Sequence, residues 1–365
     1  MILNDLPNIG PITLNRLLQE LGGDPREILQ APKRRLEAVR GVGPETSDAL
    51  VNWRTHFDLA REEERLAKAG AVFITGRDEG YPRLLKEIHD PPIGLYRKGT
   101  YLFGQPCIAV VGSRRTTLYG QSVAKKLGSE LARLGFCVVS GLARGIDTAA
   151  HEGALAVGGR TAAVLGCGLD IVYPPENLDL YRRIAETGAV LSEFPFGRKA
   201  DKQTFPMRNR VVAGISEAIV VVESDVSGGA MITARFAGEQ GRLIFAVPGR
   251  IDQPTSAGCH QLIRDGATLL TSVDDILNEL SYLDGLRPQA IATPGEASVL
   301  EQLLPELGDD ERRVFEQLKG GSVLVIDALV AATGLGAPQV SAALMMLELK
   351  RLVTKRADGS FEARS

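Results

Sequence analysis

Cysteine is scarce in this sequence, and long apolar runs are absent from it. Its 365 residues include four cysteines, Cys107, Cys137, Cys167 and Cys259, and none of them belongs to a Cys-x-x-Cys pair. Widely spaced cysteines beside apolar runs favour reduced, buried thiols in a cytosolic protein over a disulfide framework or a zinc site. No apolar segment approaches the roughly 18 residues of a membrane span, and the first residues lack the pattern of a secretory signal. We therefore expect a cytoplasmic protein without a structural metal.

The motifs of several enzyme and cofactor-binding classes are also missing. The glycine loop that begins at Gly112 has its next glycine only at Gly120, so the Gly-x-Gly-x-x-Gly turn of dinucleotide-binding proteins is absent, as is the P-loop of ATPases. His151 does not belong to a His-Glu-x-x-His zinc motif. Asp147 and His151 lie one helical turn apart and could form a base–orienter pair, although a capping Asp147 and a solvated or hydrogen-bonded His151 are the favoured interpretation. We expect no cofactor and no conventional catalytic site.

Charge is concentrated in one short segment. The formal net charge is −3, and none of the ranges 1–70, 71–280 and 281–365 carries more than one net positive charge. Residues 198–210 hold five cations and one acid around a single aromatic ring, Phe205. Because cations neutralise phosphates and an aromatic face stacks on an unpaired base, this segment favours single-stranded nucleic acid as a ligand. A basic surface loop with Phe205 in the core is the alternative.

Between residues 71 and 280, strand-like apolar runs alternate with segments of helical length. The strand-like runs are 71–75, 107–111, 136–140, 161–165, 189–192, 218–222 and 243–247. Helices are expected at 117–134, 146–157, 176–187, 205–215 and 230–240. This alternation predicts an α/β fold with an extended Rossmann-like, doubly wound and mainly parallel sheet that helices cover on both faces.

Smaller modules flank this domain. Residues 1–65 read as short helices in which Gly10-Pro11 and Gly43-Pro44 each precede a helical pattern, an arrangement that resembles a tandem helix-hairpin-helix or SAM-like module. Helix starts of that motif contact phosphates, but a structural or partner-binding role is the favoured interpretation. Residues 281–305 read as a linker, and 306–365 resemble a winged helix. Its third helix offers mostly small or uncharged exposed residues, which favours protein contact or a structural role over reading of a DNA groove.

Glycine-bearing loops follow several of the predicted strands. These loops contain residues 112–115, 141–145, 166–168 and 227–229. Since ligands of doubly wound sheets bind beyond the carboxyl ends of the strands, we expect the loops to converge on one binding edge. Glycine permits close approach of the backbone to a ligand, and the N-termini of the following helices offer N–H groups to anions.

Motifs of the central domain occur in a recognisable order. They are Val-Gly-Ser-Arg-Arg at 111–115, Ser-Gly-Leu-Ala-Arg-Gly-Ile-Asp at 140–147, Gly-Cys-Gly-Leu-Asp at 166–170, Tyr-Pro at 173–174, Phe-Pro-Met-Arg-Asn-Arg at 205–210, Ile-Thr-Ala at 232–234 and Val-Pro-Gly at 247–249. In these motifs the sequence resembles the DNA processing protein A family (DprA, also called Smf), densely over residues 71–280 and more loosely in the flanking modules. One departure is Ser-Gly-Gly at 227–229, where the family commonly has a second serine.

The resemblance implies a cytoplasmic single-stranded DNA-binding protein rather than an enzyme. Members of the family protect incoming DNA in natural transformation and help to load a RecA-type recombinase in place of single-strand-binding protein. They act as homodimers through the Rossmann-like domain. In this chain the resemblance suggests a dimer surface at Leu262, Ile263, Leu269 and Leu270, which could equally be core residues.

The family's DNA-binding residues carry over onto matching positions. The resemblance implies that Arg114 and Lys202 contact phosphates and that Phe205 supports or stacks on a base. One of Arg208 and Arg210 could instead anchor the loop internally. The full set of expected DNA-binding residues is Gly112, Ser113, Arg114, Arg115, Gly141, Lys202, Phe205, Arg208, Asn209, Arg210, Ser227, Gly228 and Gly229.

Two other functions stay open. Related Rossmann-like proteins cleave nucleotide N-glycosidic bonds, and the Ser-Gly-Gly loop at 227–229 with Glu239 on the following helix faintly resembles their glycine-rich loop and glutamate. A pure protein scaffold for a recombinase would fit the terminal modules but would leave the basic segment unexplained.

Overall fold

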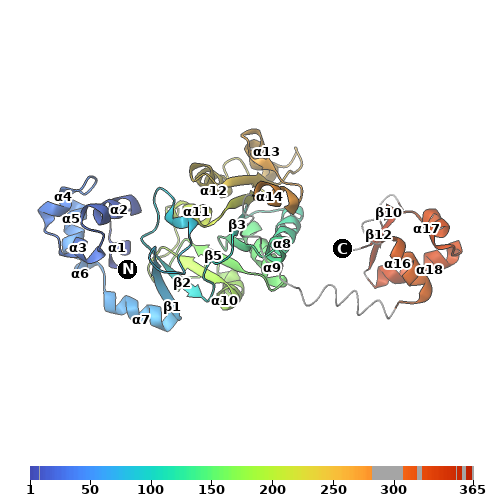
Figure 1. Ribbon diagram of the computed structural model, residues 1–365, viewed down its shortest axis with the longest axis horizontal. Coiled ribbons are helices and arrows are strands. Elements are labelled where there is room, and N and C mark those ends of the chain that lie inside the picture. Colours follow the sequence, from blue (N-terminus) through green and yellow to red (C-terminus); the bar gives the residue numbers. More distant parts are fainter. Residues whose placement is uncertain (8, 282–306, 319–322, 351, 356–358, 364–365) are drawn as a thin grey trace. The chain divides into compact units, whose positions relative to one another are not determined.

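The chain forms two compact units, which divide between Ala292 and Thr293. The computed structural model describes residues 1–7, 9–281, 307–318, 323–350, 352–355 and 359–363 (Figure 1). The expected linker at 281–305 lies, apart from Ser281, outside the described residues.

The first unit begins with short helices. They are α1 (Ile2–Asp5), α2 (Pro11–Glu20), α3 (Pro25–Gln30), α4 (Lys33–Glu37), α5 (Pro44–Val51), α6 (Trp53–His56) and α7 (Leu59–Ala69). Both α2 and α5 start with a proline after a glycine N-cap, where the missing N–H of proline costs no hydrogen bond. Apolar side chains spaced along these helices, including Leu17, Ile28 and Leu50, form one buried cluster.

A nine-stranded sheet follows, in the order β1-β2-β6-β5-β4-β3-β7-β8-β9. Its strands are β1 (Ala71–Thr75), β2 (Gly94–Gly99), β3 (Cys107–Val111), β4 (Cys137–Ser140), β5 (Thr161–Leu165), β6 (Ala189–Ser192), β7 (Ala218–Val221), β8 (Leu243–Ala246) and β9 (Thr268–Leu269). All pairs from β6 to β9 are parallel, whereas β2 pairs antiparallel with both β1 and β6. The prediction of a doubly wound, mainly parallel sheet is therefore confirmed.

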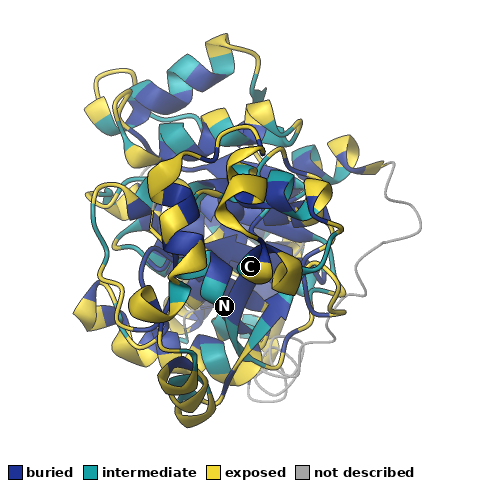
Figure 2. Cartoon of the chain, turned by 90° about the vertical axis from the view of Figure 1, so that its left-hand side faces the viewer, coloured by how far each residue is buried: buried dark blue, intermediate teal, exposed yellow. Residues whose placement is uncertain are grey.

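Helices cover both faces of the sheet (Figure 1). They are α8 (Leu118–Arg133), α9 (Ile146–Ala156), α10 (Leu178–Thr187), α11 (Thr204–Ile215), α12 (Gly229–Glu239), α13 (Ala257–Arg264) and α14 (Val273–Glu279), with short 3₁₀ turns η1 (Leu84–Lys86), η2 (Pro175–Asn177) and η3 (Pro254–Ser256). Successive residues of β3 alternate between two buried layers, with Ala109 on one side and Ile108 and Val110 on the other. Burial on both sides explains why the central strands are continuous apolar runs. Many helices present buried residues inward and exposed residues outward (Figure 2).

Helices α8 and α9 pack unusually closely through two glycines. A Cβ atom added at Gly128 would lie 2.3 Å from the carbonyl oxygen of Ala150, and one added at Gly153 would lie 2.1 Å from that of Lys125. Neither position has room for a methyl group without movement of backbone. Since α8 and α9 follow the loops after β3 and β4, this contact fixes the spacing of those two loops.

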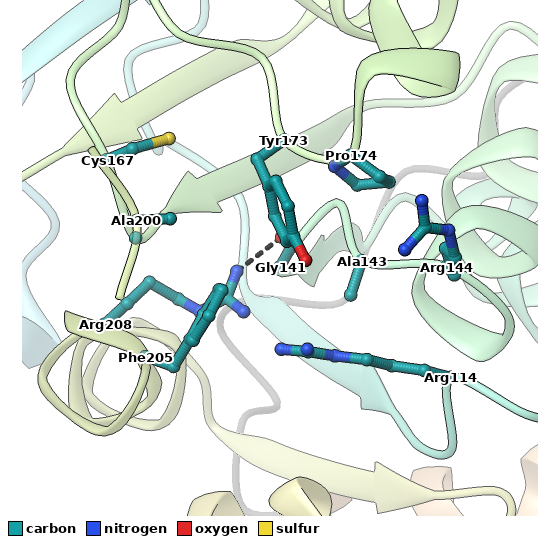
Figure 3. A pocket seen from close by; sticks show the side chains of 11 residues that line it. Arg114, Gly141, Ala143, Arg144, Cys167, Tyr173, Pro174, Ala200, Phe205 and Arg208 are labelled. Carbon is teal, nitrogen blue, oxygen red and sulfur yellow. Dashed lines mark hydrogen bonds between the residues drawn. The ribbon is translucent and has the colours of Figure 1, made fainter. Parts of the chain in front are cut away.

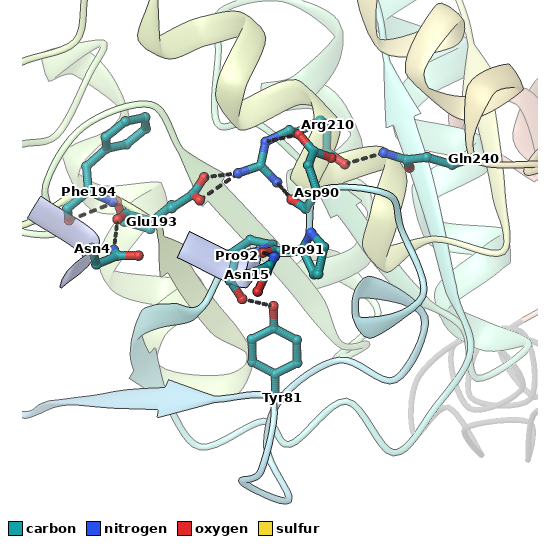
Figure 4. Close-up of polar contacts among 11 residues, drawn as sticks. Asn4, Asn15, Tyr81, Asp90, Pro91, Pro92, Glu193, Phe194, Arg210 and Gln240 are labelled. Carbon is teal, nitrogen blue, oxygen red and sulfur yellow. Dashed lines mark hydrogen bonds and ion pairs between the residues drawn. The ribbon is translucent and has the colours of Figure 1, made fainter. Parts of the chain in front are cut away.

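The helical module is joined to the sheet by hydrogen bonds. Asn4 Nδ2 donates to the carbonyl oxygen of Glu193 at 2.5 Å, and Asn15 Nδ2 donates to that of Pro91 at 3.2 Å (Figure 4). From α7, the buried Glu62 accepts the N–H of Phe196 at 2.9 Å, while Arg65 donates to the carbonyl oxygen of Phe196 at 3.1 Å. These hydrogen bonds attach the helical module to the loop that follows β6.

The second unit is a winged helix, as predicted. It contains α16 (Asp309–Leu318), α17 (Ile326–Thr333), α18 (Ala337–Leu349) and a sheet of β10 (Val323–Leu324), β12 (Phe361–Ala363) and β11 (Val353–Lys355) in that order. A separate apolar cluster forms its core. Over the described residues no single helix is long and apolar enough to cross a membrane, and one bent pair, α17 with α18, passes by length and composition only.

Candidate nucleic-acid interface

Three of the four predicted glycine loops, those at 112–115, 141–145 and 227–229, line a groove of about 530 Å³ at the carboxyl edge of the sheet, while Gly166 and Cys167 of the fourth line a smaller adjoining pocket. The expected residues that line the groove are Gly112, Ser113, Arg114, Arg115, Gly141, Phe205, Arg208, Asn209, Gly228 and Gly229. Asp147 also lines it, as do residues to which the sequence assigned no role, among them Asp225, Thr233 and Thr255. Lys202, Arg210 and Ser227, which the sequence grouped with this set, are not among the lining residues.

An arginine and two aromatic rings form the most distinctive part of this site. The guanidinium of Arg114 lies over the Phe205 ring, and the Tyr173 ring is tilted by 47° against Phe205 with 5.9 Å between the ring centroids (Figure 3). Phe205 stands in the first turn of α11 and is partly exposed, so the alternative of a core phenylalanine does not describe it. Tyr173 is 41% exposed. Sequence reasoning noted the Tyr-Pro pair but assigned Tyr173 no role.

The loop after β3 is held from below. The N–H of Ser113 donates to the carbonyl oxygen of Glu223 at 2.6 Å, and the buried Glu223 carboxylate accepts from the hydroxyls of Thr116 and Thr117 at 2.6 and 2.5 Å. A Cβ at Gly112 would lie 2.8 Å from the same carbonyl oxygen, so the close approach requires glycine. These contacts therefore fix the backbone of the loop that carries Arg114.

The loop after β4 is organised by Asp147. Its Oδ2 accepts the N–H groups of Gly141 and Ala143 at 3.1 and 3.3 Å. Burial raises the pKa of Asp147, and the nearby Arg208 opposes that rise. His151 is buried separately, with Nδ1 2.6 Å from the Thr161 hydroxyl, and burial lowers its pKa to about 3. The two side chains thus have separate partners. The expectation of a hydrogen-bonded His151 is met, whereas that of a capping Asp147 is wrong, because Asp147 lies inside the first turn of α9 and accepts N–H groups of the preceding loop, while the N-cap is Gly145.

Arg208 forms the floor of the groove. Its Nη1 donates to the carbonyl oxygen of Gly141 (Figure 3). The same atom donates to the carbonyl oxygen of Val164 at 2.6 Å, and Nε donates to Asn209 Oδ1 at 3.1 Å. The side chain is buried, and burial lowers its pKa whereas Asp147 raises it. Arg208 thus joins the loop after β4 to strand β5, while its side chain lines the groove.

Arg210 lies in the interior instead. It donates to both carboxylate oxygens of Glu193 at 2.6 Å and to the carbonyl oxygen of Asp90 at 2.7 Å (Figure 4). Burial raises the pKa of Glu193, and Arg210 opposes that rise. The sequence left open whether Arg208 or Arg210 anchors the loop internally. Both make internal contacts, and Arg210 is the one that lies away from the groove.

Lys202 projects from the turn that precedes α11 and is exposed. Asp201 shapes this turn by accepting the N–H groups of Thr204 and Gln203 at 2.9 and 2.8 Å, hydrogen bonds that lower its pKa. Arg198 pairs with Asp201 at 2.6 Å. Lys202 thus lies just before the groove residues of α11 in the sequence, and its side chain is open to solvent.

The four expected dimer residues have different surroundings. Leu262 and Leu270 are buried in the two core layers, and Ile263 packs partly buried against the first of them. Leu269 is 45% exposed in the edge strand β9. Glu239, the carboxylate of the alternative enzyme, is exposed at the end of α12, pairs with Arg235 at 3.7 Å and does not line the groove.

Comparison with known proteins identifies the family. The family model described as DNA recombination-mediator protein A matches residues 72–281, and the DprA winged helix domain matches 287–359. Protein Smf of Synechocystis sp. is 34% identical, over 99% of this chain and 97% of that protein.

Two solved structures extend the comparison. The X-ray structure of DNA processing protein A from Streptococcus pneumoniae has a TM-score of 0.66 and 34% identity, covering 76% of this chain and 95% of that chain. DNA processing protein A from Helicobacter pylori, described for its unique single-stranded DNA binding mode, has a TM-score of 0.52 and 31% identity, covering 57% of this chain and 96% of that chain. With matches of this extent, the chain belongs to the DNA recombination-mediator protein A family.

Proposed function

We propose that this protein captures single-stranded DNA, with little regard to sequence, in the groove at the carboxyl edge of the sheet. The observation that carries the proposal is the placement of an exposed guanidinium, that of Arg114, against the partly exposed Phe205 ring at the mouth of a glycine-lined groove. Single-strand binders without sequence preference combine cations along the backbone with aromatic faces for bases.

Each side chain has a role in this proposal. Arg114 and Arg115 on the first loop, and Lys202 before α11, neutralise phosphates. Phe205, with Tyr173 beside it, supplies a stacking face, which is worth roughly 1–3 kcal/mol per base. Arg208 supports the loops and contributes its charge from the groove wall. Three exposed cations predict that log K falls against log salt with a slope of about −2, at ~0.7 per phosphate.

Family membership supports a proposal for the wider role. We propose that the protein acts in the cytoplasm, protects single-stranded DNA and helps to load a RecA-type recombinase in place of single-strand-binding protein. Its four free, buried cysteines fit a reducing compartment. A homodimer would place two grooves on one strand and gain avidity. The single-stranded DNA binding described for the Helicobacter pylori relative supports the choice of ligand.

Fluorescence anisotropy with matched single-stranded and duplex oligonucleotides, across a salt series, tests the proposal. Single strands should bind more tightly, and Arg114→Ala should weaken binding to all sequences alike and reduce the salt slope. Arg182→Ala is the matched control, because Arg182 is exposed on α10 and does not line the groove. Equal affinity of wild type and Arg114→Ala would refute the site. Release of free base from a nucleoside monophosphate would favour the enzyme instead.

A further inference from the structure

Another cavity lies between the helical module and one end of the sheet. It measures about 440 Å³ and is lined by residues of α2, the start of α3, the end of β1 and the loop that leads to β2. None of these residues lines the groove at the carboxyl edge of the sheet. Cavities of this size at the boundary between two parts of a protein are common ligand sites.

The walls of this cavity are mainly apolar. Leu18 comes from α2, Pro25 begins α3, and Pro91, Pro92 and Ile93 precede β2. Proline has no backbone N–H, so the wall formed by these prolines offers apolar surface rather than hydrogen-bond donors. A bulky apolar side chain that entered the cavity would leave water for apolar surroundings, which is favourable.

Hydrogen bonds hold the proline wall in place (Figure 4). Asn15 Nδ2 donates to the carbonyl oxygen of Pro91 at 3.2 Å. The hydroxyl of the buried Tyr81 donates to the carbonyl oxygen of Pro92 at 2.6 Å. Asn15 and Tyr81 themselves line the cavity. The wall is therefore formed before an occupant arrives, which reduces the cost of ordering it on binding.

The charged residues of the lining are both cations. Arg77 and Lys86 line the cavity and are exposed. Arg77 Nη2 donates to the carbonyl oxygen of Gly23 at 3.1 Å, and among the described residues neither cation forms an ion pair. The nearby Asp78 does not line the cavity, and its carboxylate accepts the N–H and the hydroxyl of Thr75 at 2.7 and 2.8 Å. The charge of the lining thus favours an anionic occupant.

The adjoining strand favours a peptide as that occupant. Strand β1 is the end strand of the sheet and, in the described part of the chain, pairs with β2 alone. Thr75, its last residue, and Gly76 line the cavity. The outer side of an end strand carries unpaired N–H and C=O groups, and an extended peptide can pair with them.

We propose that this cavity docks an extended segment of a partner protein in which a bulky apolar side chain lies next to acidic residues. The apolar side chain fills the cavity, the carboxylates pair with Arg77 and Lys86, and the backbone of the segment meets the end of β1. The site is independent of the proposed function, because it shares no lining residue with the groove. The protein can therefore hold this partner and a DNA strand at the same time.

Selection from a phage-displayed library of random peptides on the full-length protein tests the proposal. We expect the recovered peptides to combine acidic residues with phenylalanine, leucine or isoleucine. Labelled copies should bind the wild type in anisotropy titrations and bind Lys86→Glu about three- to tenfold more weakly, because the reversed charge repels carboxylates. Lys125→Glu is the matched control, since Lys125 is an exposed lysine of α8 that does not line the cavity.

Lys86→Glu should keep the thermal midpoint of the wild type, because Lys86 is exposed. Recovery of no peptide, or of peptides that bind Lys86→Glu as tightly as the wild type, would overturn the proposal. If no peptide is recovered and anilinonaphthalene sulfonate, an apolar organic anion, binds the wild type but not Lys86→Glu, the cavity takes a small molecule instead.

Failure of this site can be distinguished from failure of the DNA groove. Lys86→Glu should bind single-stranded DNA as the wild type does, whereas Arg114→Ala should bind the selected peptides as the wild type does. Loss of peptide binding in Arg114→Ala would place the peptides in the groove and overturn the docking site.

Discussion

The guanidinium carbon of Arg114 lies 4.6 Å from the centroid of the Phe205 ring, which joins the loop after β3 to the first turn of α11. The two residues are far apart in sequence, yet each limits the motion of the other. A cation over an aromatic face is attracted to the ring. Arg114 is thus positioned before DNA arrives, and a base must use the part of Phe205 that Arg114 leaves open or displace the guanidinium.

Because the guanidinium of Arg114 lies on a ring, the contribution of its charge and that of its planar shape can be tested separately. Arg114→Lys keeps the charge but loses the planar group that lies on the ring. We expect affinity for single-stranded DNA to fall about three- to tenfold with an unchanged salt slope, since the number of neutralised phosphates is preserved. Anisotropy titrations over a salt series would measure both quantities. A lysine variant that binds like wild type would show that the ring contact contributes nothing.

Arg208 should matter to stability more than its place at the groove suggests. Arg208→Met leaves the carbonyl oxygens of Gly141 and Val164 buried without their donor and removes the partner of Asp147. Charged hydrogen bonds of this kind contribute roughly 1.5–3 kcal/mol, so we expect a loss of about 2–4 kcal/mol in the free energy of unfolding. Urea denaturation would measure it. Arg115→Met, at an exposed position on the same groove, should change stability by less than about 0.5 kcal/mol.

His151 should make the fold sensitive to acid. Its folded pKa of about 3 lies below the ordinary value of 6.5, because burial disfavours the charged ring. The unfolded chain therefore binds a proton between these two values and the folded chain does not, so stability falls as pH decreases through this window. The slope is up to about 1.4 kcal/mol per pH unit.

Urea denaturation at several pH values compares the wild type with His151→Gln. The variant should be less stable at neutral pH, because its fit against Thr161 is poorer, but should lose less stability between about pH 6.5 and pH 5. The difference in loss should be up to about 2 kcal/mol. If the free energy of unfolding falls equally with pH in the two proteins, protonation of His151 does not cause the loss of stability.

Glu62 should affect DNA binding from outside the groove. Glu62→Ala removes the acceptor of the Phe196 N–H and loosens the loop that leads to Lys202. We expect weaker single-strand binding and a salt slope smaller by ~0.7, the contribution of one phosphate. Glu62→Gln keeps an acceptor and should restore the slope, and Glu64→Ala, at an exposed position of α7, is the control. Lower thermal stability with a wild-type slope would mean that Glu62 only supports the fold.

The parallel core of the fold was readable from the sequence because its strands are buried on both faces. Runs such as 107–111 and 161–165 match β3 and β5 residue for residue. Strand β2 was missed, since Gly94–Gly99 carries Arg97 and Lys98 and is apolar only in its first half. Its pairing with β1 and β6 is a tertiary contact that no local pattern announces. The two-residue β9 is too short for any periodicity.

The candidate site was predictable as a set of loops but not as a set of contacts. The carboxyl-edge rule placed the glycine loops correctly, and a groove forms there. The position of Arg210 had a usable signal: residues at i and i+3 share a helix face, so Phe205 and Arg208 go together while Arg210 points elsewhere. The place of Tyr173 beside Phe205 had none, because the two residues come from different elements.

The close packing of α8 against α9 predicts where damaging substitutions can occur. Gly128 and Gly153 let α8 and α9 approach each other closely, and these helices follow the loops that carry Arg114 and Gly141, so the missing side chains influence how far apart those loops stand. A single methyl group at either position would push α8 and α9 apart. The loops that precede these helices would then also separate, and the groove would widen. Damaging variants of this protein should therefore include changes at residues that never touch a nucleotide, and a survey confined to the DNA surface would overlook them.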